Sequence, residues 1–248
     1  MTTDRSPLKQ PPLHNPAESL LEQRDNLVFD KILYPLISTA ILAAMAGWAW
    51  LQHFWGPPPN PNIMTAIAIL SLAVTVVVTF RTLKQARLIN RGIAAEKAVG
   101  QFLERFHAQG YNVIHDIPVK TAGKAFNIDH LLIGPKGIFT IETKYRKKPL
   151  RGECKVSYDG TQVSINGQTP DRDPIAQALG QAKWVQDYLK SCTALPSIPV
   201  TPIVVYPGWF IDYLQARDAK VKVANEQLIW SCIQSSPHQL APHDAKLV

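Results

Sequence analysis

The stretch NIDHLLIGPKGIFTIETK, residues 127–144, decides the fold of the C-terminal part of the chain. It holds two apolar runs around the turn residues 134–137, and the outer end of each run carries a carboxylate, Asp129 or Glu142. Short apolar runs joined by a Gly- and Pro-containing turn predict a β-hairpin. If Pro135 and Lys136 are the central turn residues, the two strands pair so that Asp129 lies directly opposite Glu142.

The opposed carboxylates need something to hold them together. Directly opposed cross-strand side chains have Cβ atoms about 4.5–5.5 Å apart, and like charges at that separation repel. Lys144 lies two residues beyond Glu142, on the same face of the strand. A raised carboxylate pKa would relieve the repulsion, and so would a divalent cation such as Mg²⁺, which prefers oxygen ligands.

The same spacing describes a site for metal-assisted hydrolysis of a phosphodiester. A metal on Asp129 and Glu142 would polarise a phosphoryl oxygen and lower the pKa of bound water. Lys144 would then orient that water or stabilise the charge that develops in the transition state. The alternative is a salt-bridged strand end, in which Lys144 neutralises both acids.

The remaining pattern predicts an α/β or α+β domain with a mixed central sheet. A helix from Ala86 to about Ala108, closed by Gly110, precedes three strands and a second hairpin with a turn at residues 159–160. A helix follows, with Asp173 as its cap and Pro174 at its first position. Two strands, one of them VTPIVVYP, and a last helix from about Glu226 to Gln234 complete the order.

An Asp, an apolar strand and Glu-x-Lys together resemble the PD-(D/E)XK nuclease superfamily. The longer form NIDHLLIGPKGIFTIETKYRK looks like the nuclease-related domain (NERD), over roughly Gly92 to Tyr206. The resemblance implies a restriction-endonuclease-like mixed sheet flanked by helices, with Asp129, Glu142 and Lys144 as the catalytic core. Ile128 stands where the superfamily name has a proline.

The resemblance also implies two supporting residues. The family has an acidic residue in a Gly-x-x-Gly-Glu setting, and here Glu96 follows Gly92, although Ala95 replaces the second glycine. An exposed helix charge is the alternative for Glu96. The family's Pro-x-x-Gln motif corresponds to Pro174 and Gln177, and Gln177 would contact the attacking water, the metal shell or the scissile phosphate. Gln181, one helical turn further, is the rival candidate.

Two uncharged runs near the N-terminus predict a transmembrane hairpin. Residues 32–50 and 63–80 contain no charged side chain, and each is long enough to cross a hydrocarbon core as a helix. Buried helices of a soluble protein are the alternative. The proline-rich residues 56–62 between the runs predict a tight loop. Four positive residues follow the second run and favour a cytoplasmic location for both termini, in an inner-membrane protein: Arg81, Lys84, Arg87 and Arg91.

Positive charge is concentrated in the C-terminal part. Residues 81–248 contain 22 Lys and Arg against 14 Asp and Glu, while residues 1–80 are nearly neutral. An excess of positive charge is suited to binding a polyanion, either nucleic acid or anionic lipid. The alternative is an ordinary solvated surface with no such partner. A basic loop directly follows the hairpin, and it is a candidate for nucleic-acid binding, with Tyr145 available for stacking on a base: Arg146, Lys147, Lys148 and Arg151. Three scattered cysteines indicate no disulfide framework.

The sequence therefore predicts four parts: a disordered or amphipathic segment 1–30, transmembrane helices within 31–81 (about 32–55 and 63–80), a nuclease-related domain 86–236 and a tail 237–248. The predicted function is Mg²⁺- or Mn²⁺-dependent hydrolysis of DNA, or of RNA, on the cytoplasmic side. One alternative is a membrane tether that binds nucleic acid without cutting it. Another is a structural protein whose basic face meets anionic lipid.

Overall fold

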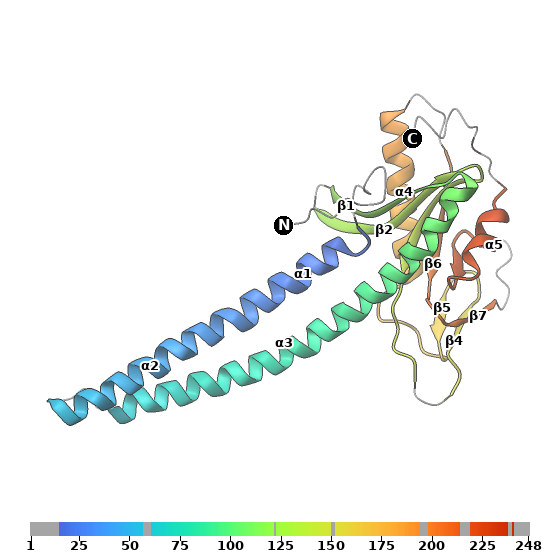
Figure 1. The fold of residues 1–248 in the computed structure, drawn as a ribbon. Coiled ribbons are helices and arrows are strands. Elements are labelled where there is room, and N and C mark those ends of the chain that lie inside the picture. The colour runs from blue at the N-terminus through green and yellow to red at the C-terminus, as the bar shows by residue number, and fades with distance from the viewer. Residues whose placement is uncertain are drawn as a thin grey trace. The chain divides into compact units, whose positions relative to one another are not determined.

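The structure is a computed structural model that describes residues 15–56, 61–121, 123–149, 152–193, 198–213, 219–237 and 240 (Figure 1). The predictions for the N-terminal 14 residues, for the middle of the proline-rich loop and for most of the tail lie outside these residues. The chain forms two compact units. One is Ser19–Arg91, and the other combines the residues up to Glu18 with Gly92–Val248.

The first unit is helical in its described residues apart from the extended Gly56. It contains α1 (Glu18–Val28), a π-helical turn η1 (Phe29–Leu33), α2 (Tyr34–Trp55) and the first part of α3 (Pro61–Leu103). Two helical stretches, Glu18–Trp55 and Pro61–Gln109, contain segments long and apolar enough to cross a membrane. Large apolar side chains are exposed along both, including Phe54 and Leu70.

Polar contacts join α2 to α3 as a helical hairpin. The Thr39 hydroxyl lies 3.1 Å from Ser71 Oγ and 2.7 Å from Thr75 Oγ1. The Trp50 indole N–H donates to Thr65 Oγ1 at 2.8 Å. Hydroxyl contacts of this kind are typical between helices surrounded by lipid, where apolar side chains gain little by facing each other.

The α3 helix is longer than the sequence pattern predicted. The pattern treated the apolar run and the helix from Ala86 as separate elements, but the structure has one helix that continues to Leu103. Lys and Arg end the apolar run after Phe80 without ending the helix, because both are good helix formers. A 3₁₀ turn, η2 (Glu104–Gln109), follows, and Gly110 closes it at φ 80° as the C-terminal glycine that the sequence predicted.

The second unit has a mixed five-stranded sheet in the order β1-β2-β3-β6-β8. The first three strands are antiparallel neighbours, and β6 and β8 add in parallel to β3. This confirms the predicted mixed sheet. The strands are β1 (Asn112–Thr121), β2 (Lys124–Gly134), β3 (Gly137–Thr143), β6 (Val200–Val205) and β8 (Lys222–Ala224).

The register of the central hairpin is the predicted one. Leu131 pairs with Thr140 and Ile133 with Ile138, around a turn whose central residues are Pro135 and Lys136. The ladder ends at His130 and Ile141, so Asp129 lies one residue beyond the last paired position. The turn therefore fixes the register up to the edge of the candidate site.

A smaller sheet in the order β5-β4-β7 lies in the same unit. Its strands are β4 (Lys155–Tyr158), β5 (Val163–Ile165) and β7 (Phe210–Tyr213). The hairpin of β4 and β5 was predicted, but β7 was not. It is a four-residue strand that pairs in parallel with the distant β4.

Helices cover both faces of the large sheet (Figure 1). Val99 and Leu103 of α3, together with α5 (Ile229–Gln234), pack against one face of the sheet. Val185 and Leu189 of α4 (Pro174–Cys192) pack against the other face. The carboxyl end of β3 and the first turns of α4 therefore meet on one side of the sheet.

Candidate functional site

Glu142 is the centre of a hydrogen-bonded cluster at the end of β3. Its side chain is buried, with 4 % of its surface exposed. Its Oε1 accepts hydrogen bonds from Lys144 Nζ at 2.6 Å and from Gln177 Nε2 at 2.8 Å. Lys144 Nζ also donates to Gln177 Oε1 at 2.8 Å, which closes a three-membered ring of contacts. Glu142 and Lys144 are thus an ion pair, as the salt-bridge interpretation required, and Gln177 bridges the two partners.

The first turns of α4 place two glutamine side chains in contact with Glu142. Asp173 caps the helix by accepting from the backbone N–H groups of Ile175 and Ala176 at 2.8 and 3.2 Å, as its position predicted. Gln177 and Gln181 are one turn apart and lie on the same side of α4. Gln181 Nε2 donates to Glu142 Oε2 at 2.6 Å, so the two glutamines bind different oxygens of one carboxylate. The sequence treated them as rivals, but the structure brings both to Glu142.

Asp129 lies beside this cluster at the end of the β2–β3 ladder. Its Oδ2 accepts a hydrogen bond from the Thr143 backbone N–H at 2.7 Å. Burial raises the pKa of Asp129 well above its ordinary value, and the negative charges of Glu142 and Glu96 raise it further. The Thr143 N–H and the Lys144 charge oppose this rise in pKa but are the smaller effects. The repulsion predicted for the opposed carboxylates therefore contributes to the raised pKa of Asp129, after the larger effect of burial.

Glu96 is a buried residue of α3 rather than an exposed helix charge. Only 3 % of its surface is exposed. Burial raises the pKa of Glu96 to about 7, with smaller contributions from the charges of Asp116 and Glu142, while a hydrogen bond from the Ala17 backbone lowers it. The charge of Glu142 raises the pKa of Glu96, and the charge of Glu96 raises that of Asp129, so the three acids interact electrostatically.

Asp116 is a further acid at this point, and the sequence did not predict it. The β1–β2 register pairs His115 with His130 and Ile117 with Ile128, so Asp116 lies opposite Asp129. Its backbone is left-handed, with φ 51°. Such a conformation is rare for a residue with a Cβ atom and is often found at functional sites.

The strands change their alternation at these two aspartates. Ile128 and Leu131 lie in the same apolar cluster, although strict alternation would put residues three apart on opposite faces. The Asn127 side-chain amide donates to Asp116 Oδ1 and so holds the two strands together at the irregular position. The sequence contained one indication of this arrangement, the charged residue Asp116 inside the strand NVIHDIPV. Spacing alone did not show which acid Asp116 would face.

The side chain of His130 contacts His115 rather than the carboxylates of the cluster. Its Nδ1 contacts Nδ1 of His115 at 2.8 Å, and Nε2 of His115 contacts Glu104 Oε1 at 2.7 Å. Burial lowers the pKa of His130 well below its ordinary value, and His115 adds to this effect. A buried neutral imidazole with a histidine neighbour is a packing element rather than an acid or base of the site.

The chemistry of the cluster fits a hard divalent cation. Asp129, Glu142 and Glu96 supply oxygen donors, and Gln181 Oε1 is buried without a hydrogen-bond partner. Among the described residues, no group of three or more His, Cys, Asp or Glu side chains is arranged to hold a metal ion. Mg²⁺ commonly takes only one or two protein carboxylates and completes its shell with water and substrate phosphate. Asp129 and Glu142 are therefore the two residues of the cluster that could hold such an ion.

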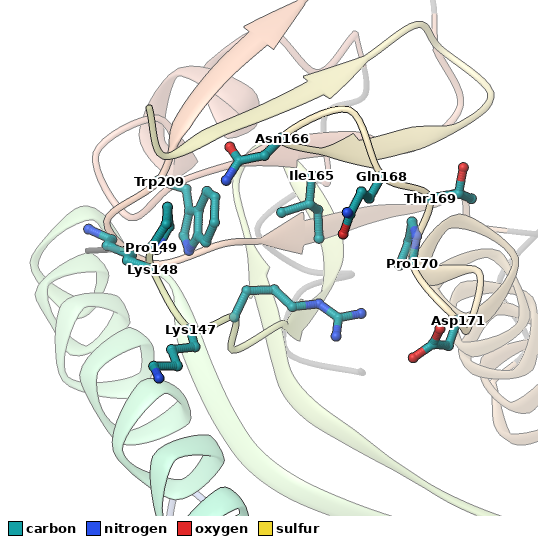
Figure 2. A pocket seen from close by; sticks show the side chains of 11 residues that line it. Lys147, Lys148, Pro149, Ile165, Asn166, Gln168, Thr169, Pro170, Asp171 and Trp209 are labelled. Carbon is teal, nitrogen blue, oxygen red and sulfur yellow. The ribbon is translucent and has the colours of Figure 1, made fainter. Parts of the chain in front are cut away.

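A basic pocket of about 660 Å³ begins two residues after Lys144. In Figure 2, Lys147 and Lys148 lie on one side, and Gln168, Thr169 and Asp171 lie on the other. Arg146 adds a third positive charge to the lining, and the buried Trp209 forms part of the wall. Tyr145, just before the pocket, is exposed. The predicted basic loop thus forms one wall of a cavity, except for Arg151, which lies outside the described residues.

Comparison with known proteins agrees with this geometry. A family model described as the nuclease-related domain matches residues 91–207. An uncharacterized protein of Bacillus anthracis is 38 % identical over 146 residues, which are 58 % of this chain and 66 % of that protein. The chain thus spans just under two thirds of this relative. No solved structure matches the chain. Residues 91–207 are therefore a nuclease-related domain, as the motifs around Asp129 and Glu142 had indicated.

Proposed function

We propose that this protein is a membrane-anchored, metal-dependent nuclease that hydrolyses phosphodiester bonds of DNA, with RNA as the second substrate class. One observation carries the proposal. In a nuclease-related domain, the carboxylate of Glu142 is bound by Lys144, Gln177 and Gln181, and Asp129 lies beside it. Acids, a lysine and amides in this arrangement supply what phosphodiester hydrolysis needs: a cation site, a positive charge and hydrogen-bond donors.

Each residue of the cluster has a distinct role in this proposal. Asp129 and Glu142 would hold Mg²⁺ or Mn²⁺, which lowers the pKa of a bound water and polarises the phosphoryl oxygen. Lys144 would contact the attacking water or the charge that develops on the phosphate. Gln177 accepts a hydrogen bond from Lys144 and donates one to Glu142, so it keeps the ammonium group directed at the site. Glu96 would support the group from α3.

The basic pocket provides the place for the nucleic-acid backbone next to the site. Arg146, Lys147 and Lys148 face a single carboxylate, Asp171, among the lining residues. Contacts of these cations with phosphates would give binding that depends on salt and tolerates many sequences. The pocket begins two residues after Lys144 in the chain, so the proposal places the backbone of the bound strand there.

The two apolar helical stretches would anchor the domain in the inner membrane. Four positive residues between Arg81 and Arg91 follow the second stretch, and such residues stay on the cytoplasmic side. Both termini and the nuclease-related domain would then be cytoplasmic. The enzyme would act on nucleic acid close to the membrane.

The test uses the full chain in detergent with supercoiled plasmid and labelled single-stranded DNA and RNA, with Mg²⁺, Mn²⁺ or a chelator. We expect metal-dependent cleavage that falls by about 100-fold or more in Asp129→Asn and in Lys144→Gln. Asp212→Asn and Lys190→Gln, at positions remote from Glu142 in the chain, are the matched controls. Titration calorimetry with both metals should detect binding in the wild type and lose it in Asp129→Asn. Full cleavage by either site variant would refute the assignment.

One observation favours a second function, a tether that binds nucleic acid without cutting it. Both oxygens of Glu142 already accept hydrogen bonds from protein groups, so a cation at this carboxylate has to displace or share those contacts. The tether predicts that the wild type binds no metal, with or without nucleic acid. It also predicts DNA binding that survives Asp129→Ala and is lost when Lys147 and Lys148 are both neutralised.

A further inference from the structure

The segment just before α1 packs into the nuclease-related domain. Ala17 is fully buried, and its backbone N–H donates to Glu96 Oε1 at 2.8 Å. The two residues are 79 positions apart, but both belong to the same compact unit. A residue next to the first helix therefore supplies a hydrogen bond to one of the site acids.

A tight turn presents this N–H to Glu96. The Glu18 backbone N–H donates to the carbonyl of Asn15 at 3.2 Å, and the Asn15 N–H donates back to Glu18 Oε2 at 3.1 Å. Ala17 inside the turn has φ 62°, a conformation that residues with a side chain rarely adopt. Local strain of this kind persists only where the surroundings hold it in place. The burial of Ala17 and its bond to Glu96 are such surroundings.

A glycine on α3 makes room for the same segment. Gly100 is one helical turn after Glu96, and a Cβ atom there would lie 2.8 Å from Cγ of Pro16. Contacts that short do not occur without a shift of one partner. Glycine is otherwise unfavourable inside a helix, where alanine is preferred. Gly100 therefore admits the Pro16 ring at the expense of helix propensity.

We propose that Asn15–Ala17 is a positioning segment of the candidate site, which holds the Glu96 carboxylate toward the other acids through the Ala17 amide. The inference rests on the proposed function. The negative charges of Asp116, Asp129 and Glu142 interact unfavourably with this carboxylate. The hydrogen bond from the Ala17 amide fixes its orientation against that repulsion. When the segment leaves, Glu96 loses this donor and turns away from the site, while the core of the domain is unchanged.

The first test is Gly100→Ala in the full chain. The methyl group displaces Pro16, and the gain in helix propensity offsets only part of the lost packing and hydrogen bond, so the protein should stay folded with a modestly lower Tm. Amide hydrogen exchange in peptides covering residues 15–18 should become fast. The value of kcat should fall by roughly tenfold, the range expected for loss of one hydrogen bond to a charged group. The KM for DNA should not change, because the segment does not line the basic pocket.

The second test is rescue. Pro16→Gly in the Gly100→Ala background removes the ring that the new methyl group meets, and it should restore slow exchange and most of kcat. The two single variants and the double variant form a cycle whose coupling reports the contact itself. Gly47→Ala is the matched control, because an added Cβ there meets nothing within 4 Å.

The possible failures are distinguishable. Cleavage that stays at the wild-type rate in Gly100→Ala while exchange at residues 15–18 becomes fast would refute the positioning role alone. Fast exchange at residues 15–18 in the wild type would refute the contact. A wild type that protects these amides but cleaves no substrate would refute the proposed function, and the positioning role with it.

Discussion

Replacing Glu96 by glutamine should stabilise the protein at alkaline pH and leave its stability nearly unchanged at acidic pH. The glutamine keeps the shape of the side chain and the oxygen that accepts from Ala17, but it removes the buried charge. The pKa of Glu96 rises from an ordinary 4.5 to about 7, chiefly because of burial. Once the carboxylate is fully ionised, a rise of this size in pKa costs the folded state about 3 kcal/mol.

The direction of this pH dependence follows from the linkage between protonation of Glu96 and folding. A carboxyl group with a raised pKa in the folded state favours folding at low pH, where it is protonated. That contribution is complete below the unfolded value near 4.5 and is lost as the pH rises through about 7. Glu96→Gln removes this pH dependence. Its advantage over the wild type should be small at pH 5 and near its maximum at pH 8.5.

The assay is thermal denaturation of the full chain in detergent with a chelator, at pH 5 and pH 8.5. For a unit of this size, about 3 kcal/mol corresponds to an upper limit of roughly 6–12 °C in Tm at the higher pH. Glu22→Gln, at an exposed position of α1, is the matched control. A Tm difference that is the same at both pH values would refute the burial argument. A variant less stable than the wild type at pH 8.5 would do so as well.

Three further changes test the fold and the basic pocket. Gly134→Ala should destabilise the domain by about 1–3 kcal/mol, because a Cβ atom there would lie 2.2 Å from Cδ1 of Tyr111, and an unchanged Tm would contradict this packing. Asp173→Ala should lower stability by about 1 kcal/mol through loss of the α4 cap, whereas Asp173→Asn should retain most of it. Neutralising Lys147 and Lys148 together should reduce the slope of log affinity against log salt for DNA by about 2, measured by fluorescence anisotropy, and an unchanged slope would remove these lysines from the interface.

The parts of the site that the sequence predicted are those fixed by local geometry. The turn at Pro135 and Lys136 sets the register of its own hairpin, so the relation of Asp129 to Glu142 and Lys144 could be derived by counting residues. The cap at Asp173 likewise fixes where α4 begins and therefore which of its residues face the end of β3. Short-range rules were sufficient in both cases because turn and cap are adjacent to the residues that they position.

The parts that were missed depend on long-range contacts. Asp116 lies opposite Asp129 because of the β1–β2 register and a left-handed backbone, and neither can be read from the short stretch NVIHDIPV. The sequence could not decide between Gln177 and Gln181, because helical spacing places both on one face of α4. It did not show that each glutamine binds a different oxygen of Glu142. The strand β7 was missed because its pairing partner, β4, is about fifty residues away in the sequence.

The hydrogen bond between Ala17 and Glu96 also bears on how the protein is made. Ala17 leaves the ribosome long before Glu96, and both apolar helices are synthesised in the interval. If both stretches span a membrane as proposed, the bond can form only when the two ends of the hairpin finish on the same side of the bilayer. In a chain that inserted one helix and not the other, the N-terminal turn and Glu96 would lie on opposite sides of the membrane. Such a molecule would carry a buried Glu96 carboxylate without its Ala17 donor, so an error of insertion at one end of the chain would be felt at the candidate site, 79 positions away in the sequence.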